Sequence, residues 1–430
     1  MIIEYVFLVT FFLVLGIAAY IRIRHPFWSI QPVFHTYDFW RYWFVVPYVI
    51  QEEYPARMST TYNKFLQYGS VKTQYFLDAT DAEQARILDL IQCHYLRSTR
   101  VLYTMDMSDL RIQCSSHISA PCLVSLYSTQ QWQPSGVNLV VAATPNVGVL
   151  VAYPVRFAFR GQPLMSVFYW EYIVIHREED CDPKHARTLI QTHEANQRRL
   201  HPDIPVSIFR KDVDLSEGIR PFIIFPVARF EVVASRIGKP PLAPHCTVTR
   251  IERESMHRLM DFFYDMTNNT RTSFDMYIFP EMPALQSRIE SNQWLFYTMQ
   301  SRDQLLAVYA FKDTKVVHEE HSDAASCLEL MCSQSLMDVN DDKAFFAGWL
   351  HAMHDILQYS RPISPQDQRD EQQRDQQQIG FITIPQIGHN DKILDMWKWK
   401  YAPRSTHDAA IYFYNYVCPM MRTNHSWITL

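Results

Sequence analysis

Few residues that commonly carry chemistry stand at a spacing that a known reaction requires. The segment 318–321 (HEEH) has the side chains of a metal site, but it lacks the HExxH spacing, so we interpret it as a solvated turn. His351, His354 and Asp355 share one predicted helix face, where no further ligand supports a metal ion. The sequence contains no CxxC pair and no GxSxG elbow. Common motifs therefore predict no metal site and no activated nucleophile.

Composition and charge exclude several classes of protein. With 430 residues the chain is long enough for two or three domains, and 48% apolar against 20% charged residues excludes global disorder. The net charge of -5 argues against a protein that binds nucleic acid through a basic surface. Only 10 glycines are present, and no GxxxxGKS/T or GxGxxG occurs, so no glycine-rich phosphate loop is expected. The 8 cysteines need no disulfide framework at this length, which favours reduced thiols.

One segment near the N-terminus has the composition of a membrane anchor. Tyr5–Ile21 is a continuous apolar run that, with the apolar residues beside it, just spans a hydrocarbon core of about 30 Å. It lacks the basic start and the small-residue cleavage site of a signal peptide. Arg22, Arg24 and His25 follow the run, so the positive-inside rule predicts the N-terminus outside and the rest of the chain in the cytosol. The alternatives are a buried helix or a cleaved leader.

The apolar periodicity of the remaining chain predicts an α/β fold in two similar halves. Thr80 and Glu83 form a capping box at the start of a helix over residues 80–95, and Asp182 followed by Pro183 begins a helix that ends near Arg199. The strands predicted in this first half are 120–127, 138–143, 147–153, 165–176, 204–209 and 230–233.

The second half repeats this succession of elements after a predicted linker, 238–244 (GKPPLAP). Its predicted helices are 257–266, 344–358 and 392–399, and its predicted strands are 294–299, 305–311, 381–385 and 409–417. The polar, Gln-rich segment 361–378 is expected to be a solvated insertion. We therefore expect an anchor over 1–24 and two halves over 25–237 and 238–430.

Four stretches, in order along the chain, resemble the N-myristoyltransferase family. Phe27–Val33 (FWSIQPV) is similar to its Phe-Trp-x-x-Gln-Pro-Val, and Val147–Pro154 (VGVLVAYP) to its Val-Gly-Phe-Ile-Ser-Ala-Ile-Pro. Glu171–His176 (EYIVIH) matches its Asn-Phe-Leu-Cys-Val-His, and Tyr412–Pro419 (YFYNYVCP) its Tyr-Leu-Tyr-Asn-Trp-Lys-Cys-Pro. The resemblance covers residues 26–430. It implies two fused GNAT-like acyltransferase halves related by a pseudo-twofold, here preceded by one transmembrane helix.

The family transfers a myristoyl group from CoA to an N-terminal glycine amine, so the resemblance implies an acyl-CoA co-substrate and no metal. The developing oxyanion needs hydrogen-bond donors, and the family's two backbone N–H groups match Tyr172 and Ile173. The amine needs a base, and the family uses the carboxylate of its last residue, which is Leu430 here. A chain end is usually a frayed tail, but the apolar end of this chain is more consistent with a buried one.

The resemblance also implies a donor site in the N-terminal half. The CoA phosphates need a cationic helix N-terminus, for which Lys184, His185, Ala186 and Arg187 are the matching residues. Asp182 and Pro183 weaken that match, because they add a negative charge and remove an N–H. The residues expected on the donor side near the N-terminus are Phe27, Trp28 and Gln31.

The departures from the family lie on the acceptor side. Its acidic stretch aligns with YLRSTR, where Arg97 and Arg100 reverse the charge and disfavour basic peptides. Its Tyr-Thr-Ala-Gly aligns with a segment that contains Phe209 and Arg210. Its glycine-rich loop aligns with 400–406 (KYAPRST), which contains Tyr401 and no glycine. Glu171 stands in place of the family's asparagine.

Three functions remain open from the sequence. The first is a membrane-tethered N-acyltransferase that uses a long-chain acyl-CoA and an altered acceptor, the N-terminal peptide of another protein. The second is a catalytically inactive relative that serves as a membrane-anchored structural or adaptor protein. The third is a GNAT-type enzyme that uses a short-chain donor such as acetyl-CoA. None of the three involves nucleic acid.

Overall fold

The computed structural model describes most of the chain. The described residues are 2–43, 46–54, 63–96, 100–129, 131–135, 138–143, 145–159, 162–176, 183–212, 215, 218–268, 274–302, 304–320, 323–337, 341–359 and 378–430. The predicted polar insertion 361–378 lies outside these residues, apart from residue 378.

Local capping explains where several helices begin. The helices are α1 (Ile2–Arg24), α2 (Phe39–Trp43), α3 (Asp81–His94), α4 (Met107–Cys114), α5 (Pro183–Leu200), α6 (Met256–Asn268), α7 (Met282–Glu290), α8 (Asp342–Tyr359) and α9 (Asn390–Lys398). The capping box predicted at Thr80 is confirmed: Thr80 Oγ1 accepts from the Glu83 N–H at 3.3 Å, and Glu83 Oε2 accepts from the Thr80 N–H at 3.1 Å. Asp106 and Asp109 form a second capping box at α4, a helix that the periodicity did not predict.

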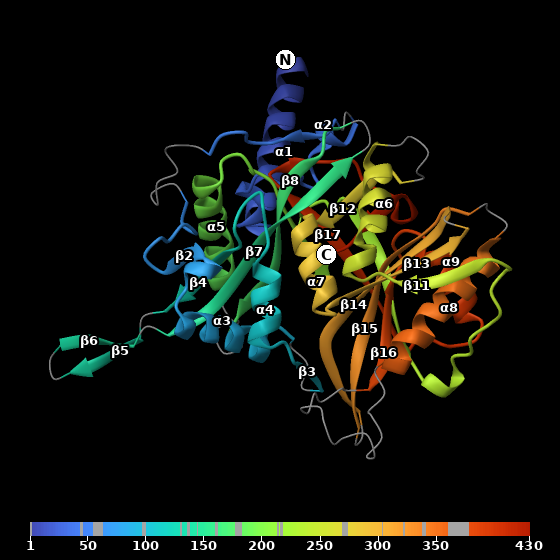
Figure 1. Cartoon of the computed structure of the whole chain (residues 1–430). Coiled ribbons are helices and arrows are strands. Elements are labelled where there is room, and N and C mark those ends of the chain that lie inside the picture. Colours follow the sequence, from blue (N-terminus) through green and yellow to red (C-terminus); the bar gives the residue numbers. More distant parts are fainter. Residues whose placement is uncertain are drawn as a thin grey trace.

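One large sheet runs through both halves (Figure 1). The strands are β1 (Tyr48–Val49), β2 (Val71–Tyr75), β3 (Val101–Tyr103), β4 (Leu123–Ser128), β5 (Gln131–Ser135), β6 (Asn138–Ala143), β7 (Asn146–Phe159), β8 (Met165–Ile175), β9 (Ser207–Asp212), β10 (Ile223–Glu231), β11 (Cys246–Arg250), β12 (Met276–Pro280), β13 (Trp294–Ser301), β14 (Gln304–Glu320), β15 (Asp323–Ser335), β16 (Ile379–Pro385), β17 (Ser405–Tyr414), β18 (Tyr416–Val417) and β19 (Ser426–Ile428). The 15-stranded sheet has the order β11-β13-β14-β15-β16-β10-β17-β9-β8-β7-β12-β19. Outside this path β4 pairs with β7 and β2, and β3 pairs with β14.

The two halves repeat the same succession of elements. The first half reads β2-α3-β3-α4-β4-β7-β8-α5-β9-β10, with the β5–β6 hairpin added before β7. The second half reads β11-α6-β12-α7-β13-β14-β15-α8-β16-β17, with α9 added before β17. The GNAT-like duplication that the resemblance implied is therefore present in the order of the elements.

The halves exchange strands reciprocally. β10 of the first half pairs with β16 of the second, and β17 of the second half pairs with β9 of the first. In the same way β3 extends the ladder of β14, and β12 extends the ladder of β7. Each half thus completes the sheet of the other, which is the arrangement expected of a pseudo-twofold.

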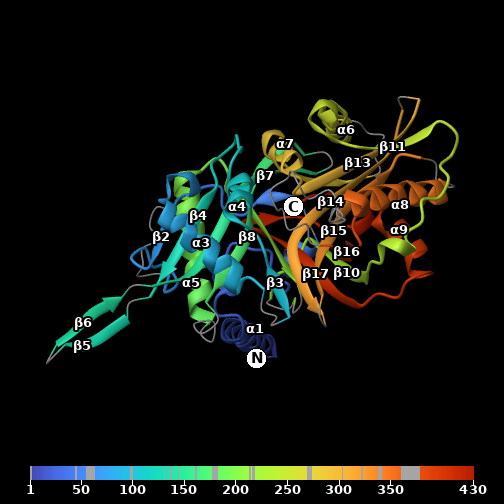
Figure 2. The same ribbon diagram turned by 60° about the horizontal axis from the view of Figure 1, so that its bottom comes forward.

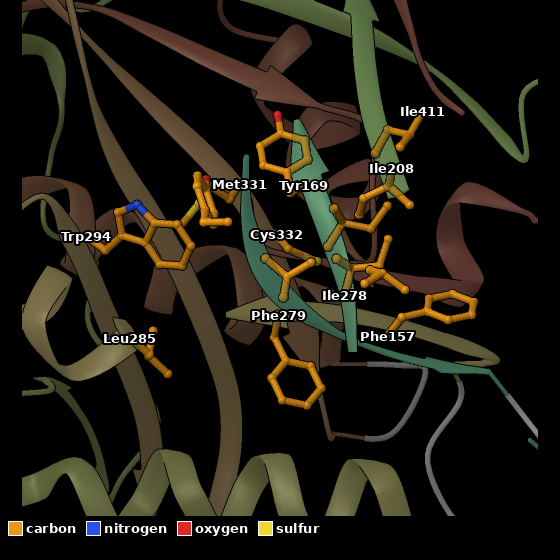
Figure 3. Close-up of a cluster of buried hydrophobic side chains, with 14 of the residues drawn as sticks. Phe157, Tyr169, Ile208, Ile278, Phe279, Leu285, Trp294, Met331, Cys332 and Ile411 are labelled. Atoms are coloured by element: carbon orange, nitrogen blue, oxygen red, sulfur yellow. The ribbon is translucent and has the colours of Figure 1, made fainter. Parts of the chain in front are cut away.

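Helices cover both faces of the sheet. The largest hydrophobic core packs α3 and α4 against β7 and β8, and α6 and α7 against β12 and β13. Figure 3 shows part of this core, where Tyr169, Trp294, Met331 and Cys332 lie together from both halves. A second core places α8 and α9 on the opposite face of the second half, and a third core places α5 on the opposite face of the first half.

The N-terminal helix α1 stands away from the folded body (Figure 1). Its residues Tyr5–Arg24 are long and apolar enough to cross a membrane, and none of that stretch is buried in the protein. Large aromatic residues are also exposed in the short helix that follows: Phe39 is 73%, Trp40 80% and Trp43 74% exposed.

Candidate functional site

A bulge in β8 marks the centre of the candidate site. Val151 of β7 pairs with Tyr172 while Ala152 pairs with Trp170, so Glu171 is the extra residue between them. The parallel pairing of β8 with β9 ends at the next step, where Trp170 pairs with Phe209. Beyond that point β8 and β9 no longer pair, and Tyr172 and Ile173 belong to this unpaired part of β8 on the side that faces β9. The predicted oxyanion donors therefore lie where the two strands part.

The second half contains an equivalent bulge, but there a side chain bridges the separated strands. Ala310 pairs with Cys332 while Phe311 pairs with Leu330, so Met331 is the extra residue in β15. Pairing of β15 with β16 ends just before, at Glu329. The Asn390 side chain bridges the parted strands, because its Nδ2 donates to Leu330 O at 3.0 Å and to Pro385 O at 2.9 Å. This side-chain bridge occupies the gap in the second half.

Glu171 is a buried carboxylate with three side-chain partners. It is 6% exposed, and Lys312 Nζ of β14 lies 3.2 Å from its Oε1. Tyr153 OH donates to its Oε2 at 2.7 Å, and Gln113 Nε2 of α4 donates to the same oxygen. A buried charge needs such compensation, because leaving water is costly for an unpaired ion.

Buried phenols extend this network. Tyr172 OH donates to Gln113 Oε1 at 3.1 Å, and Tyr103 OH lies 2.8 Å from Tyr172 OH. Burial, and secondarily the negative charge of Glu171, raise the pKa of Tyr153, Tyr172 and Tyr103 well above its ordinary value. These phenols therefore stay protonated at neutral pH and can act as hydrogen-bond donors.

The end of the chain reaches the same site. β19 pairs in parallel with β12, Trp427 is fully buried, and the Thr429 N–H donates to Ile278 O at 2.9 Å. The backbone oxygen of Leu430 then lies 3.3 Å from Lys312 Nζ. In Figures 1 and 2 the C-terminus lies between the two halves. Lys312 thus contacts both Glu171 and Leu430, two residues that were predicted for the site.

The residues predicted for the donor side lie on the N-terminal half. Trp28 stacks on Phe209 with ring centroids 5.9 Å apart, at the position where β8 and β9 part. Phe27 is buried and contacts Phe65 edge to face at 5.1 Å. Gln31 Oε1 accepts from Tyr414 OH at 2.6 Å. The N-terminal segment therefore packs directly beside the parted strands.

The start of α5 carries the residues predicted to bind phosphate. Lys184 is exposed, and His185, Ala186 and Arg187 are partly buried in the first turns of the helix. The ring of His185 lies 5.3 Å from the ring of Tyr127. The preceding Cys181 and Asp182, part of the predicted pattern, lie outside the described residues.

The residues predicted for the acceptor side are not all brought together. Arg210 forms ion pairs with Asp212 at 3.0 Å and with Glu329 of the second half at 3.2 Å. Arg100 is exposed just before β3, and Arg97 lies outside the described residues. Tyr401 packs on Trp397 at 4.1 Å and donates to Arg236 O, and among the described contacts none joins it to Glu171.

Two interpretations of the histidines can be compared with the structure. Our interpretation of 318–321 as a solvated turn was wrong, since residues 318–320 belong to β14 and pair with β15, and residue 321 lies outside the described residues. His318 is 7% exposed and contacts Arg229 Nη1 at 3.1 Å. Strand pairing of β14 with β3 and β15 buries it. Among the described residues no group of three His, Cys, Asp or Glu side chains could hold a metal ion.

Sequence reasoning missed three central side chains. Lys312 lies one residue beyond the predicted strand 305–311, Gln113 lies on the unpredicted helix α4, and Tyr153 was predicted only as a strand residue. Their partners are distant along the chain, and no local motif marks them.

Comparisons with known proteins agree with this architecture of two fused GNAT-like halves. No protein-family model and no curated protein matches the sequence. Among solved structures, Saccharomyces cerevisiae N-myristoyltransferase with bound myristoyl-CoA aligns with a TM-score of 0.65 and 11% identity over 94% of each chain. A second structure of that complex gives a TM-score of 0.61 and 12% identity over 94% of each chain. A third, which also contains inhibitors, gives 0.64 and 11% over 94% of this chain and 91% of that one. The protein therefore has the N-myristoyltransferase fold with a highly divergent sequence.

Proposed function

We propose that this protein is an N-acyltransferase that moves a long-chain acyl group from acyl-CoA to an N-terminal amine. The observation that carries the proposal is the bulge at Glu171, where β8 and β9 part beside Lys312 and Leu430. It combines a strand irregularity, where β8 no longer pairs with β9, with a carboxylate that could serve as a base, and acyl transfer to an amine needs both oxyanion donors and a base. The N-myristoyltransferase fold over 94% of the chain supports the same reaction.

The donor is an acyl-CoA with the thioester carbonyl at the bulge. The structural neighbours contain bound myristoyl-CoA, which supports a long-chain donor. Lys184, His185 and Arg187 at the start of α5 would bind the phosphates, because a cationic helix N-terminus attracts anions. Phe27 and Trp28 would line the donor side of the parted strands.

In the transfer, the amine nitrogen attacks the thioester carbon, the C–S bond breaks, and CoA leaves as its thiol. The backbone N–H groups of Tyr172 and Ile173 would stabilise the negative charge that develops on the carbonyl oxygen. The carboxylate of Leu430 would take one proton from the acceptor ammonium, so that the neutral amine can attack, and a second N–H proton would then pass to the leaving sulfur. Lys312, 3.3 Å from the Leu430 oxygen, would hold that base in position.

The inactive alternative rests on Arg210. This cation occupies the segment that matches the family's amine-binding residues, and it is bound by Asp212 and Glu329. Because Arg210 holds Asp212, this carboxylate is not free to bind a cationic acceptor. An adaptor that has kept the fold but binds no acceptor would carry such a substitution without loss of function.

We also propose that α1 tethers the protein to a membrane, with the N-terminus outside and residues 25–430 in the cytosol. The exposed aromatic residues Phe39, Trp40 and Trp43 lie shortly after the helix, and Trp is favoured at the membrane interface. A tether suits an enzyme whose donor and product both partition into lipid.

Titration calorimetry of the full chain in lipid nanodiscs tests the proposal, with empty nanodiscs as the blank. Myristoyl-CoA is expected to bind with micromolar or tighter affinity, and acetyl-CoA to bind much more weakly. Equal binding of both donors would favour a short-chain enzyme. Binding of neither would refute the enzyme and leave the adaptor.

A further inference from the structure

Arg288 of α7 is a buried cation whose donors are only partly used. Its side chain is 2% exposed, and its Nε and Nη2 have no hydrogen-bond partner among the described residues. The guanidinium contacts two aromatic rings, Tyr153 at 4.9 Å and Trp294 at 4.8 Å. Ring faces attract the positive charge, but they accept none of the in-plane N–H groups that a guanidinium directs outwards.

Arg288 lines a pocket beside the candidate site. The pocket is small, with a cavity volume of about 30 Å³, which is room for about two water molecules or for one carboxylate group. Its lining also includes Gln113, Tyr172, Lys312 and Lys315. The Lys312 and Lys315 side chains are 24% and 26% exposed, so this end of the pocket reaches solvent.

Arg288 is the one cation of the pocket lining without a direct ion pair among the described residues. Lys315 lies 3.1 Å from Asp109 and 3.3 Å from Asp313, and Lys312 pairs with Glu171. The three carboxylates balance the three cations in number, so what Arg288 offers a ligand is unused hydrogen-bond donors rather than an excess of charge. An arginine fork binds a planar carboxylate through two parallel hydrogen bonds, which is the chemistry that the free Nε and Nη2 offer.

The pocket and the transfer site share their walls. Tyr172 and Lys312 belong to both, and the ring of Tyr153 contacts Arg288 while its OH donates to Glu171. The Tyr153 ring therefore lies between Arg288 and the Glu171 carboxylate at the bulge. That position fits a part of the acceptor close to its reacting amine.

We propose that this pocket binds a carboxylate of the acceptor, adjacent to the amine that receives the acyl group, with Arg288 as its main ligand. The inference rests on the proposed acyl transfer. It defines the acceptor as acidic near its N-terminus. The exposed Arg100 ahead of β3 agrees with a site that selects against basic acceptors.

Peptide titration of the full chain in phosphatidylcholine nanodiscs tests this inference. The probes are the amidated peptides Gly-Asp-Ala-Ser-Ala-Tyr and Gly-Asn-Ala-Ser-Ala-Tyr, with and without a non-hydrolysable thioether analogue of myristoyl-CoA. The acidic peptide is expected to bind at least tenfold more tightly than its amide counterpart. Sodium acetate is expected to compete with the acidic peptide.

Variants connect that preference to Arg288. R288Q is expected to reduce the affinity ratio below threefold, and R288K, which keeps the buried charge and protects folding, to reduce it partly. R253Q is the matched control, since Arg253 is 74% exposed beside the end of α7 and its loss should leave the ratio unchanged.

Three results would overturn the inference: equal binding of the two peptides, a ratio that survives in R288Q, or no binding of either peptide. Acetate that stabilises the wild type but not R288Q, without any peptide preference, would identify a site for a free anion instead. Donor binding, measured in the same preparation, separates these results from failure of the proposed function. The inference can fail while myristoyl-CoA still binds.

Discussion

Replacing Lys312 by methionine should destabilise the protein more than its partial exposure suggests. The variant K312M leaves the Glu171 carboxylate, 6% exposed, without its cation. Removing one member of a fully buried pair costs about 3–5 kcal/mol. The hydrogen bonds from Tyr153 and Gln113 remain and offset part of that cost, at about 1 kcal/mol each. We therefore expect a loss of about 2 kcal/mol in the free energy of unfolding at pH 7.

Urea unfolding followed by tryptophan fluorescence measures this loss. The matched control is K392M, because the Lys392 side chain is also 24% exposed but its partner Asp342, at 2.7 Å, is 46% exposed. An exposed pair contributes at most about 1 kcal/mol. Equal losses in the two variants would refute the reasoning about Glu171.

Three further predictions concern the chain end, acid stability and the membrane. Two glycines added after Leu430 should reduce acyl transfer at least 100-fold and leave myristoyl-CoA binding unchanged, as measured by single-turnover kinetics and calorimetry. An unchanged rate would eliminate this carboxylate as the base. Burial, and then the positive charge of Arg288, lower the pKa of His117 to about 4, so its folded form binds protons more weakly than its unfolded form. Stability should therefore fall as the pH drops from about 6.5 to 4, and H117Q should flatten that dependence in urea unfolding; an unchanged slope would contradict it. A glycosylation sequon placed with a spacer before Met1 should be modified, and the triplet at Asn424 should not, as read by a gel shift that endoglycosidase removes. The reverse pattern would invert the proposed topology.

The sequence predicted those parts of the fold that depend on local signals. The capping box at Thr80, the proline at the start of α5 and the apolar periodicity of β7 and β8 are all properties of neighbouring residues. The resemblance at Phe27–Val33 and Tyr412–Pro419 predicted the duplicated architecture. The division between residues 237 and 238 stays a prediction.

The parts that were missed depend on pairing between distant residues. Lys312 and Glu171 form an ion pair although they are 141 positions apart in the sequence, and no motif near either residue predicts this contact. His318 looked like a turn residue because its neighbours are polar, but the ladder between β14 and β3 buries it. Arg288 was not singled out because its helix α7 is short and carries no periodic signal of its own.

The reciprocal strand exchange also has a consequence for the timing of synthesis. β9 acquires its partner β17 only when residues 405–414 have left the ribosome. At 5–20 residues per second, the wait after β9 has been made is roughly 10–40 s. During that interval the N-terminal half has an unpaired strand edge, and such an edge can pair with other chains. Nascent molecules of this protein should therefore depend on chaperones until β17 has been synthesised.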